Sequence, residues 1–214
     1  MKAFRKLIIV TLIVLACAAA VFFFGWTQFS VPAGKYGVML SKSGGYYPQA
    51  IMPGNFTWRW ERIVPTNAQI LVFDLTPRQV NYTADGLLPS ADLYSKVLNT
   101  KENFSWGFGM DALVTLKLEK LVSIIEKNTI QTQEALDSYI DSHIRAALQT
   151  IMYRYVSELI DNPYEYQQVK TDYHLLSEKL RGELVKTIGQ DFSVEAVTLT
   201  KLTIPDIHTY KIAE

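Results

Sequence analysis

The chain has 214 residues with 21 basic and 21 acidic side chains, which gives a formal net charge of zero at pH 7. Because there is no basic surplus to neutralise a phosphate backbone, we expect no nucleic-acid partner. Cys17 is the only cysteine, so an internal disulfide and a thiolate metal site are both excluded.

An apolar segment at residues 7–26 is predicted to be a transmembrane helix. No charged side chain occurs between Lys6 and Lys35, and twenty nearly all apolar residues in helical form span about 30 Å, the thickness of a bilayer's hydrocarbon core. Three basic residues lie in the tail of residues 1–6, so the positive-inside rule places this tail in the cytoplasm. The main domain is then extracytoplasmic, and periplasmic if the membrane is a bacterial inner membrane. Trp26 is a candidate for the membrane interface, where indole rings are enriched.

Three other interpretations of this segment stay open. A cleaved signal peptide would use the alanines at residues 18–20, but cleavage there would leave an apolar new N-terminus. A lipoprotein signal would use Cys17, although the residues that follow it stay apolar. A buried core helix would need a polar face to meet solvent, which the segment lacks. The uncleaved anchor fits the length and the flanking residues best.

Residues 31 to about 118 are predicted to be mainly β-structure. Residues 35–40 are a short apolar run bounded by glycines. Residues 69–75 form a continuous apolar run, which predicts a strand buried on both faces. Residues 112–118 alternate between apolar and polar side chains, which is typical of a half-buried strand.

The first of two aromatic clusters in this half follows a turn. After the turn at Pro53-Gly54, the alternation of Phe56, Trp58 and Trp60 with polar residues predicts another half-buried strand.

The polar stretch at residues 81–103 is predicted to be a long loop. Phe104, Trp106 and Phe108 follow it and alternate with small residues. They are interpreted either as a strand whose aromatic face lies in the core or as a loop that dips into the membrane interface.

The second half is predicted to be largely helical. A short helix is expected at residues 121–127, and a long helix at residues 133–160 carries apolar pairs every four residues. Because a helix repeats every 3.6 residues, such a stripe drifts around the axis and offers apolar surface to more than one neighbour. One neighbour is expected to be the sheet of the same domain. The rest of the stripe is interpreted either as contacting an adjacent subunit or as further core of its own domain. The candidates for an oligomer interface are Ile144, Leu148, Ile151, Tyr155 and Leu159.

The remaining elements complete an α+β pattern. Asn162-Pro163 is predicted to start a helix that ends at Gly189. Residues 192–199 alternate, slip in phase and alternate again, which predicts a strand with a bulge. Residues 207–214 are the expected start of a C-terminal helix.

No motif for catalysis or cofactor binding is present. The three histidines lie far apart in sequence, and there is no nucleophile elbow, phosphate-binding loop or dinucleotide fingerprint. We therefore expect a protein that is not an enzyme and that binds no cofactor or metal.

Several motifs occur in a specific order along residues 31–206. They are VPAGKYGV at 31–38, PGNFTW at 53–58, RQV at 78–80 and NTKE at 99–102, followed by the helices and the last strand of the second half. In this order they resemble the SPFH or band 7 domain of stomatins, prohibitins, flotillins and the bacterial HflK/HflC pair.

The resemblance implies an N-terminal transmembrane helix at residues 7–26 followed by an SPFH/band 7-like domain at residues 31–206, an α+β fold with a bent antiparallel sheet packed on helices. It implies a membrane scaffold that contacts lipid and forms a homo-oligomer, or a hetero-oligomer with an SPFH paralogue. Such scaffolds organise or enclose membrane proteins and define membrane microdomains. In bacteria the best-known guest is an FtsH-type AAA protease, so protease regulation is a further expectation.

Two hypotheses compete with the scaffold. A single-span extracytoplasmic sensor or ligand-binding module would need a concave pocket, for which Trp58, Trp60 and Trp106 are candidates. A hydrolase would need an active site assembled from distant residues, of which the sequence gives no sign.

Overall fold

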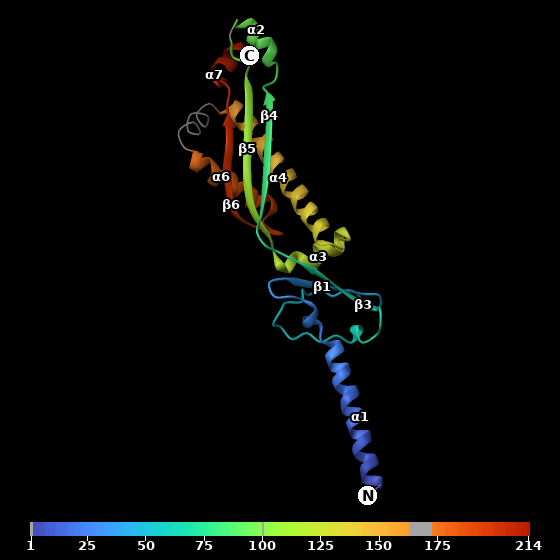
Figure 1. The fold of residues 1–214 in the computed structure, drawn as a ribbon. Helices are drawn as coiled ribbons and strands as arrows, with labels where there is room; N and C mark the ends of the chain where they lie inside the picture. Colours follow the sequence, from blue (N-terminus) through green and yellow to red (C-terminus); the bar gives the residue numbers. More distant parts are fainter. Residues whose placement is uncertain (1, 100, 163–172) are drawn as a thin grey trace. The chain divides into compact units, whose positions relative to one another are not determined.

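The computed structural model describes residues 2–99, 101–162 and 173–214. The chain divides into two compact units, the first formed by Met1–Leu75 with Leu118–Asp137 and the second by Thr76–Lys117 with Ser138–Glu214. Each unit contains its own three-stranded antiparallel sheet (Figure 1). The chain therefore has the α+β fold, with an N-terminal apolar helix and antiparallel sheets packed on helices.

The first unit combines the apolar helix with a small sheet of order β2-β1-β3. Its elements are α1 (Lys2–Gly25), η1 (Thr27–Ser30), β1 (Tyr36–Ser41), β2 (Gly45–Tyr46), η2 (Trp60–Arg62), β3 (Ala68–Phe73) and α3 (Leu118–Asn128). The predicted strand at residues 35–40, the apolar helix and the short helix at 121–127 are confirmed with small shifts of their ends.

Gly37 shows why the opening motif folds as it does. Its backbone N–H donates to the carbonyl oxygen of Ile51 at 2.8 Å, and its carbonyl oxygen accepts from the Ile51 N–H at 2.7 Å. A Cβ at Gly37 would come within 2.6 Å of the Val31 side chain, so only glycine permits this close approach. Val31, Met39 and Ile51 then close a small core over the sheet.

Two predictions for this unit are wrong. The strand at β3 is not buried on both faces: Leu71 and Phe73 on one face are buried, whereas Ile70 and Val72 on the other face are only half-buried. Phe56 to Trp60 do not form a strand. Trp58 makes an isolated β-bridge with Trp26, and the segment continues into η2. The alternation of Phe56, Trp58 and Trp60 shows that these side chains share a face, and this face stays exposed instead of packing on the unit's own sheet.

The second unit is built on a sheet of order β4-β5-β6, drawn as three long adjacent strands in Figure 1. Its elements are β4 (Arg78–Leu87), α2 (Ala91–Val97), β5 (Ser105–Leu116), α4 (Gln133–Asp161, which begins in the first unit), α6 (Tyr173–Ile188), β6 (Phe192–Thr203) and α7 (Ile207–Ala213). The long helix and the C-terminal helix are confirmed. The predicted helix start at Pro163 lies outside the described residues.

The predicted loop at residues 81–103 is largely wrong. Residues up to Leu87 continue β4, which pairs with β5 along its whole length, and α2 follows. The exposed side chains of Gln79, Asn81, Thr83 and Asp85 alternate along β4 and are polar, because one face of this strand lies in solvent. Gly86 allows the ring of Trp106 on β5 to lie against the backbone, since a Cβ there would come within 2.6 Å of that ring.

The predicted bulge in the last strand is confirmed. Leu113 pairs with Ala196 and Val114 with Val194, which leaves Glu195 as the extra residue on β6. A second register shift follows near Thr200. The bulge turns Val197 back toward the buried side of the sheet, so both halves of the alternating pattern serve the same core.

The C-terminal helix α7 is held by an N-terminal cap at Asp206 and by a buried tyrosine. The Asp206 carboxylate caps the helix by accepting from the Thr209 N–H at 3.1 Å and from the Thr209 hydroxyl at 2.7 Å. These hydrogen bonds lower the pKa of Asp206 below its usual value. Tyr210, buried on this helix, donates from its hydroxyl to the carbonyl oxygen of Pro89 at 2.9 Å.

We expect Asp206→Ala to lower the free energy of unfolding by about 1 kcal/mol, the usual value of an N-cap. Asp206→Asn should retain most of this stability because its amide oxygen still accepts. Since the folded pKa lies below the unfolded value of 3.8, the carboxylate contribution is complete above pH 3.8 and is lost as the pH falls through the folded pKa. Urea unfolding followed by circular dichroism measures this. An alanine variant as stable as the native chain at neutral pH would contradict the cap.

Candidate functional site

The first candidate site is the anchor helix α1. Ala3–Gly25 is the helix, among those described, that is long and apolar enough to cross a membrane, and its side chains are not buried inside the protein. A helix that leaves its apolar surface uncovered on all sides is typical of a membrane span. The helix therefore supports a single-pass anchor.

The C-terminal end of α1 is capped by a segment more than thirty residues further along the chain. The last four carbonyl groups of any helix lack partners within it, and a membrane offers little water to satisfy them. Here the Trp58 indole Nε1–H donates to the Phe22 carbonyl oxygen at 3.1 Å, and the Arg59 N–H donates to the Gly25 carbonyl oxygen at 2.8 Å. The chain therefore satisfies the helix end with its own donors.

A second set of hydrogen bonds secures the residues that follow the helix. The Thr27 N–H and hydroxyl both donate to the Thr57 carbonyl oxygen, at 2.9 Å and 2.8 Å. The Arg62 guanidinium donates from Nη1 to the Ser30 hydroxyl at 2.7 Å and to the Thr27 carbonyl oxygen at 3.4 Å. Thr27 is fully buried as a result.

Aromatic rings pack around the same helix end. The Phe56 ring stacks on Phe22 with centroids 5.8 Å apart and meets Trp26 edge-on at 5.3 Å. Gly25 makes room for the Trp58 indole, because a Cβ at this position would lie 2.3 Å from Nε1. We call this set of contacts, between residues 22–30 at and just after the end of α1 and residues 56–62, the anchor junction.

The charged side chains of the anchor junction are paired within it. Arg59 donates from Nε to Glu61 Oε2 at 3.1 Å, and its guanidinium lies 4.4 Å from the centroid of the Tyr47 ring. Glu61 is buried despite its charge. Pairing of this kind lowers the cost of holding charges beside an apolar surface.

Of the membrane-interface candidates, only Trp26 belongs to the anchor junction. Phe104, Trp106 and Phe108 lie at the start of β5 and on it, and all three are buried inside the second unit. Trp106 packs edge-on against Tyr153 of α4 at 6.0 Å. These positions support the interpretation as a core strand, because buried rings have no surface left for lipid.

The oligomer-interface candidates are also placed in the core of their own chain. Ile144, Leu148, Ile151 and Tyr155 are each at most 3% exposed, and the Tyr155 ring meets Phe108 of β5 edge-on at 5.7 Å. The side chain of Leu159 lies outside the described residues. The stripe on α4 thus packs against its own sheet, so this face is not carried forward as a contact between copies.

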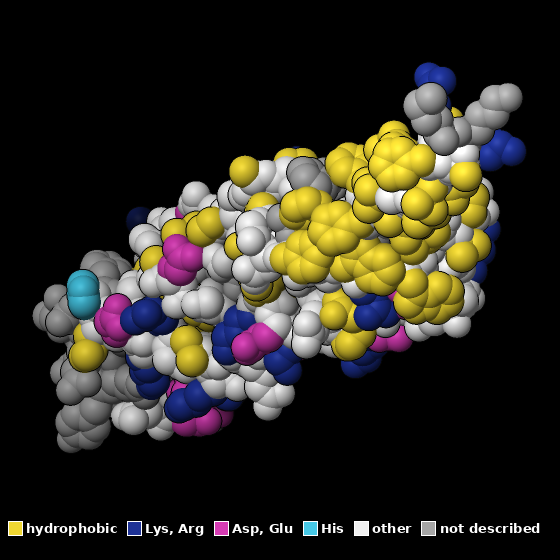
Figure 2. Space-filling view, turned by 90° about the horizontal axis from the view of Figure 1, so that it is seen from below, with side chains coloured by type: hydrophobic (Ala, Val, Ile, Leu, Met, Phe, Trp, Pro, Cys, Tyr) yellow, Lys and Arg dark blue, Asp and Glu magenta, His cyan; other side chains and the backbone are white. Residues whose placement is uncertain are grey.

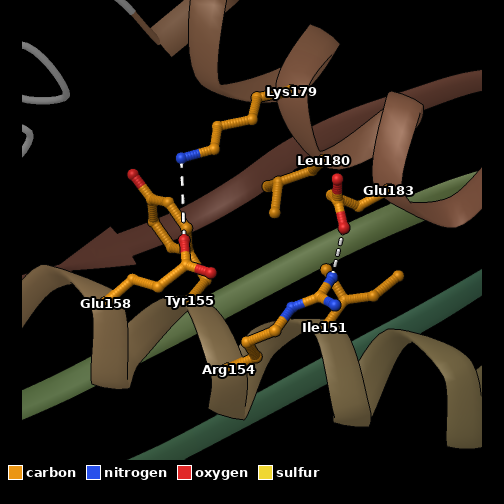
Figure 3. Close-up of a pocket in the computed structure, with 7 residues that line it drawn as sticks. All are labelled: Ile151, Arg154, Tyr155, Glu158, Lys179, Leu180 and Glu183. Carbon is orange, nitrogen blue, oxygen red and sulfur yellow. Dashed lines mark hydrogen bonds and ion pairs between the residues drawn. The ribbon is translucent and has the colours of Figure 1, made fainter.

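A small cavity of about 120 Å³ lies between α4 and α6, and Figure 3 shows the residues that line it. Arg154 forms an ion pair with Glu183 across it, and the Lys179 ammonium lies 3.7 Å from the Glu158 carboxylate and 5.2 Å from the Tyr155 ring. Lys186 donates to Glu183 at 2.7 Å and, with Arg154, holds the pKa of this carboxyl below its usual value. The basic and acidic groups here pair with one another, so the ion pairs across the cavity link the two helices.

The described parts of the chain contain no cluster of side chains suited to bind a metal ion. Among these residues there is no group of three or more His, Cys, Asp or Glu side chains that could hold a metal ion. The pocket expected for a sensor does not form within either unit: Trp58 and Trp60 belong to the first unit, whereas Trp106 is buried in the second.

Sequence reasoning missed the anchor junction itself. Its signal is the sequence WRWERI at residues 58–63, where two tryptophans alternate with charged residues directly after a turn. Aromatic and charged side chains in close alternation are typical of a membrane interface, where one end of each side chain is apolar and the other is wet.

The buried stripe on α4 makes a prediction that separates core from interface. We expect Leu148→Ala to lower the free energy of unfolding by about 2–5 kcal/mol, because the side chain is fully buried. Gln149→Ala, at the exposed neighbouring position, should change it by less than about 0.5 kcal/mol. Urea unfolding measures stability, and the mass of the folded fraction measures assembly. A Leu148→Ala protein that stays equally stable but loses its partners would contradict the core placement.

Comparison with known proteins agrees with this architecture. The family model for the SPFH domain / Band 7 family matches residues 29–213. A protein of Treponema pallidum (strain Nichols), described only as uncharacterized, is 36% identical over 190 residues, which cover 89% of this chain and 64% of that protein. The chain thus spans somewhat less than two thirds of that relative's length. A match over nearly the whole domain, together with the anchor helix and the antiparallel sheets, shows that the chain belongs to the SPFH domain / Band 7 family.

Proposed function

We propose that this protein is a membrane-anchored, non-enzymatic scaffold that assembles side by side with copies of itself or with an SPFH paralogue, and so organises or encloses other membrane proteins. Membership of the SPFH domain / Band 7 family supports a role of this type. The observation that carries the proposal is the anchor junction, in which Trp58 and Arg59 donate hydrogen bonds to the last turn of the membrane helix.

A fixed joint matters for assembly because of conformational entropy. A domain on a flexible tether must lose its orientational freedom each time it binds a neighbour, and this loss opposes association. A unit already held at a set angle to its membrane helix has lost that freedom on folding. Copies in one bilayer then present the same surface of the first unit at the same height, which favours lateral contacts.

A separate candidate for contacts between subunits lies on α2 of the second unit. Leu93 and Val97 are four residues apart, so they lie on one face of the helix, and both are exposed. Apolar side chains grouped on an exposed face mark sites of protein–protein contact more often than isolated ones do. We place a contact between neighbouring subunits on this face.

The orientation and the guest protein belong to the same proposal. The basic tail is cytoplasmic and the domain is extracytoplasmic, according to the positive-inside rule. The guest is a membrane protein, and an FtsH-type AAA protease, whose activity the assembly would modulate, is the guest that the family resemblance suggests. Purification of the protein from its native membrane with its partners, followed by identification of the proteins that accompany it, tests this part.

The mass of the full-length protein in detergent or nanodiscs is the primary test. We expect a particle of many copies, or a large assembly with a second protein, by mass photometry or multi-angle light scattering. A particle with the mass of one chain would instead favour the single-span sensor. Addition of a paralogue before the measurement distinguishes a hetero-oligomer from a monomer.

A substitution on α2 tests the contact surface. We expect Val97→Glu to reduce the mass of the assembly without loss of folding, because a charge at an apolar contact is not compensated on the partner. Ser142→Glu, at an exposed polar position on α4, is the matched control and should leave the mass unchanged. Assembly that survives Val97→Glu unchanged would remove α2 from the interface and leave the scaffold proposal itself standing.

A further inference from the structure

We propose that Tyr210 on α7 holds α2 in its helical form, so that the apolar face of α2 is available to a neighbouring subunit only while α7 is docked on it. The proposal rests on the proposed scaffold function and adds a control of its contact surface on α2. Three observations carry it: the weak local stabilisation of α2, the strained backbone at both ends of its segment, and the contacts that Tyr210 makes there.

The helix α2 has little to stabilise it locally. It has seven residues, Ala91–Val97, and an isolated helix shorter than about 12 residues is marginal in water. Its N-cap residue, Ser90, makes no side-chain hydrogen bond to the helix, and Ala91 is its buried residue. Asp92 in the first turn and Lys96 in the last turn favour the helix dipole, but such effects are small at the surface. The helical form of α2 therefore depends on contacts with other elements.

The backbone around α2 is strained at both ends. Ser90 before the helix has a φ of 56°, and Asn99 and Phe104 after it both have a φ of 51°. This left-handed region is unfavourable for residues other than glycine, although asparagine adopts it more readily than serine or phenylalanine. Strain of this kind persists where surrounding contacts impose it. The segment between β4 and β5 would therefore relax if those contacts were lost.

One side chain of α7 contacts this segment at three points. The Tyr210 hydroxyl donates to the carbonyl oxygen of Pro89 at 2.9 Å, directly before Ser90. Its ring meets the Tyr94 ring of α2 edge-on, with centroids 5.3 Å apart, and meets the Phe104 ring at 5.5 Å. Tyr210 is 4% exposed, and Figure 1 shows α2 and α7 at the same end of the β4-β5-β6 sheet. We call these three contacts the tyrosine latch.

The helix α7 is better stabilised by its own residues than α2 is. The Asp206 carboxylate accepts two hydrogen bonds from Thr209, and Ile207 is buried. Burial raises the pKa of Tyr210, so its hydroxyl stays protonated and donates near neutral pH. Loss of the tyrosine latch is therefore expected to release α2 and to leave α7 capped.

The contact face of α2 exists only while the helix is formed. Leu93 and Val97, which are 58% and 68% exposed, point the same way because residues four apart in a helix lie on one face. In an unfolded segment this pairing is lost. Figure 2 shows a different apolar surface, gathered over α1 and the neighbouring part of the first unit, whereas α2 belongs to the second unit. The tyrosine latch therefore controls a contact surface of the second unit.

Hydrogen exchange followed by mass spectrometry tests the tyrosine latch. All chains in this experiment carry Val97→Glu, so that burial by a neighbour cannot protect α2. We expect Tyr210→Ala to speed amide exchange at residues 91–98 by about tenfold or more, because the helix opens, and to change exchange at residues 110–116 of β5 by less than about twofold. Tyr210→Phe keeps the ring and loses the hydrogen bond, so its effect should be smaller. Lys211→Ala, at an exposed position on the same helix, is the matched control and should change neither.

The mass of the assembly tests the control of contact. In chains that keep Val97, Tyr210→Ala should lower the mass of the particle in nanodiscs as Val97→Glu does, and Lys211→Ala should not. Unchanged exchange at residues 91–98 in Tyr210→Ala would overturn the proposal, as would faster exchange with an unchanged particle mass.

Two further outcomes are also decisive. If Tyr210→Ala unfolds the second unit, Tyr210→Phe takes its place: faster exchange confined to residues 91–98 supports the tyrosine latch, and unchanged exchange refutes it. A native particle with the mass of one chain would refute the scaffold function instead, and the exchange experiment would still decide whether Tyr210 holds α2.

Discussion

The anchor junction depends on one constraint, which is that the backbone carbonyls at the end of a membrane helix need donors where water is scarce. In this chain the donors come from Trp58 and Arg59, which lie far along the sequence from the helix that they cap. Between α1 and these donors the chain forms β1 and β2 and then returns to the end of the helix. The fold of the first unit therefore also attaches the anchor helix, because it brings Trp58 and Arg59 to the helix end.

The same constraint explains residues that otherwise look out of place. Gly25 is the last residue of α1, and its missing side chain gives the Trp58 indole room to approach the carbonyls. Thr27 is polar yet fully buried, because both its donors are used by Thr57. Arg62 reaches back to the residues after the helix. Together these groups hold the first unit at the end of its membrane helix.

The second unit is stabilised by a different balance of interactions. One face of its sheet packs on α4 and α6 through apolar and aromatic side chains, and ion pairs across the small cavity brace the two helices. Exposed ion pairs of this kind contribute little to stability by themselves, so the apolar stripe carries most of the packing energy. The other sheet face presents polar side chains, among them a cross-strand pair between Lys201 and Asp85 that lies over Gly107. The drift of the α4 stripe is used to follow a twisted sheet and needs no second subunit.

The sequence by itself determined the elements whose pattern is local. The apolar helix, the long amphipathic helix and the bulged strand β6 follow from uninterrupted hydrophobicity, from the four-residue recurrence and from a phase slip. The prediction of a loop where β4 lies was wrong, because a strand with one face in solvent is polar at every second position. Such a strand has too few apolar residues to be recognised from hydrophobic periodicity. Only the tertiary structure decided which aromatic cluster is buried and which is exposed: Phe56, Trp58 and Trp60 alternate just as Phe104, Trp106 and Phe108 do. Periodicity shows that side chains share a face, but what covers that face depends on contacts between distant parts of the chain.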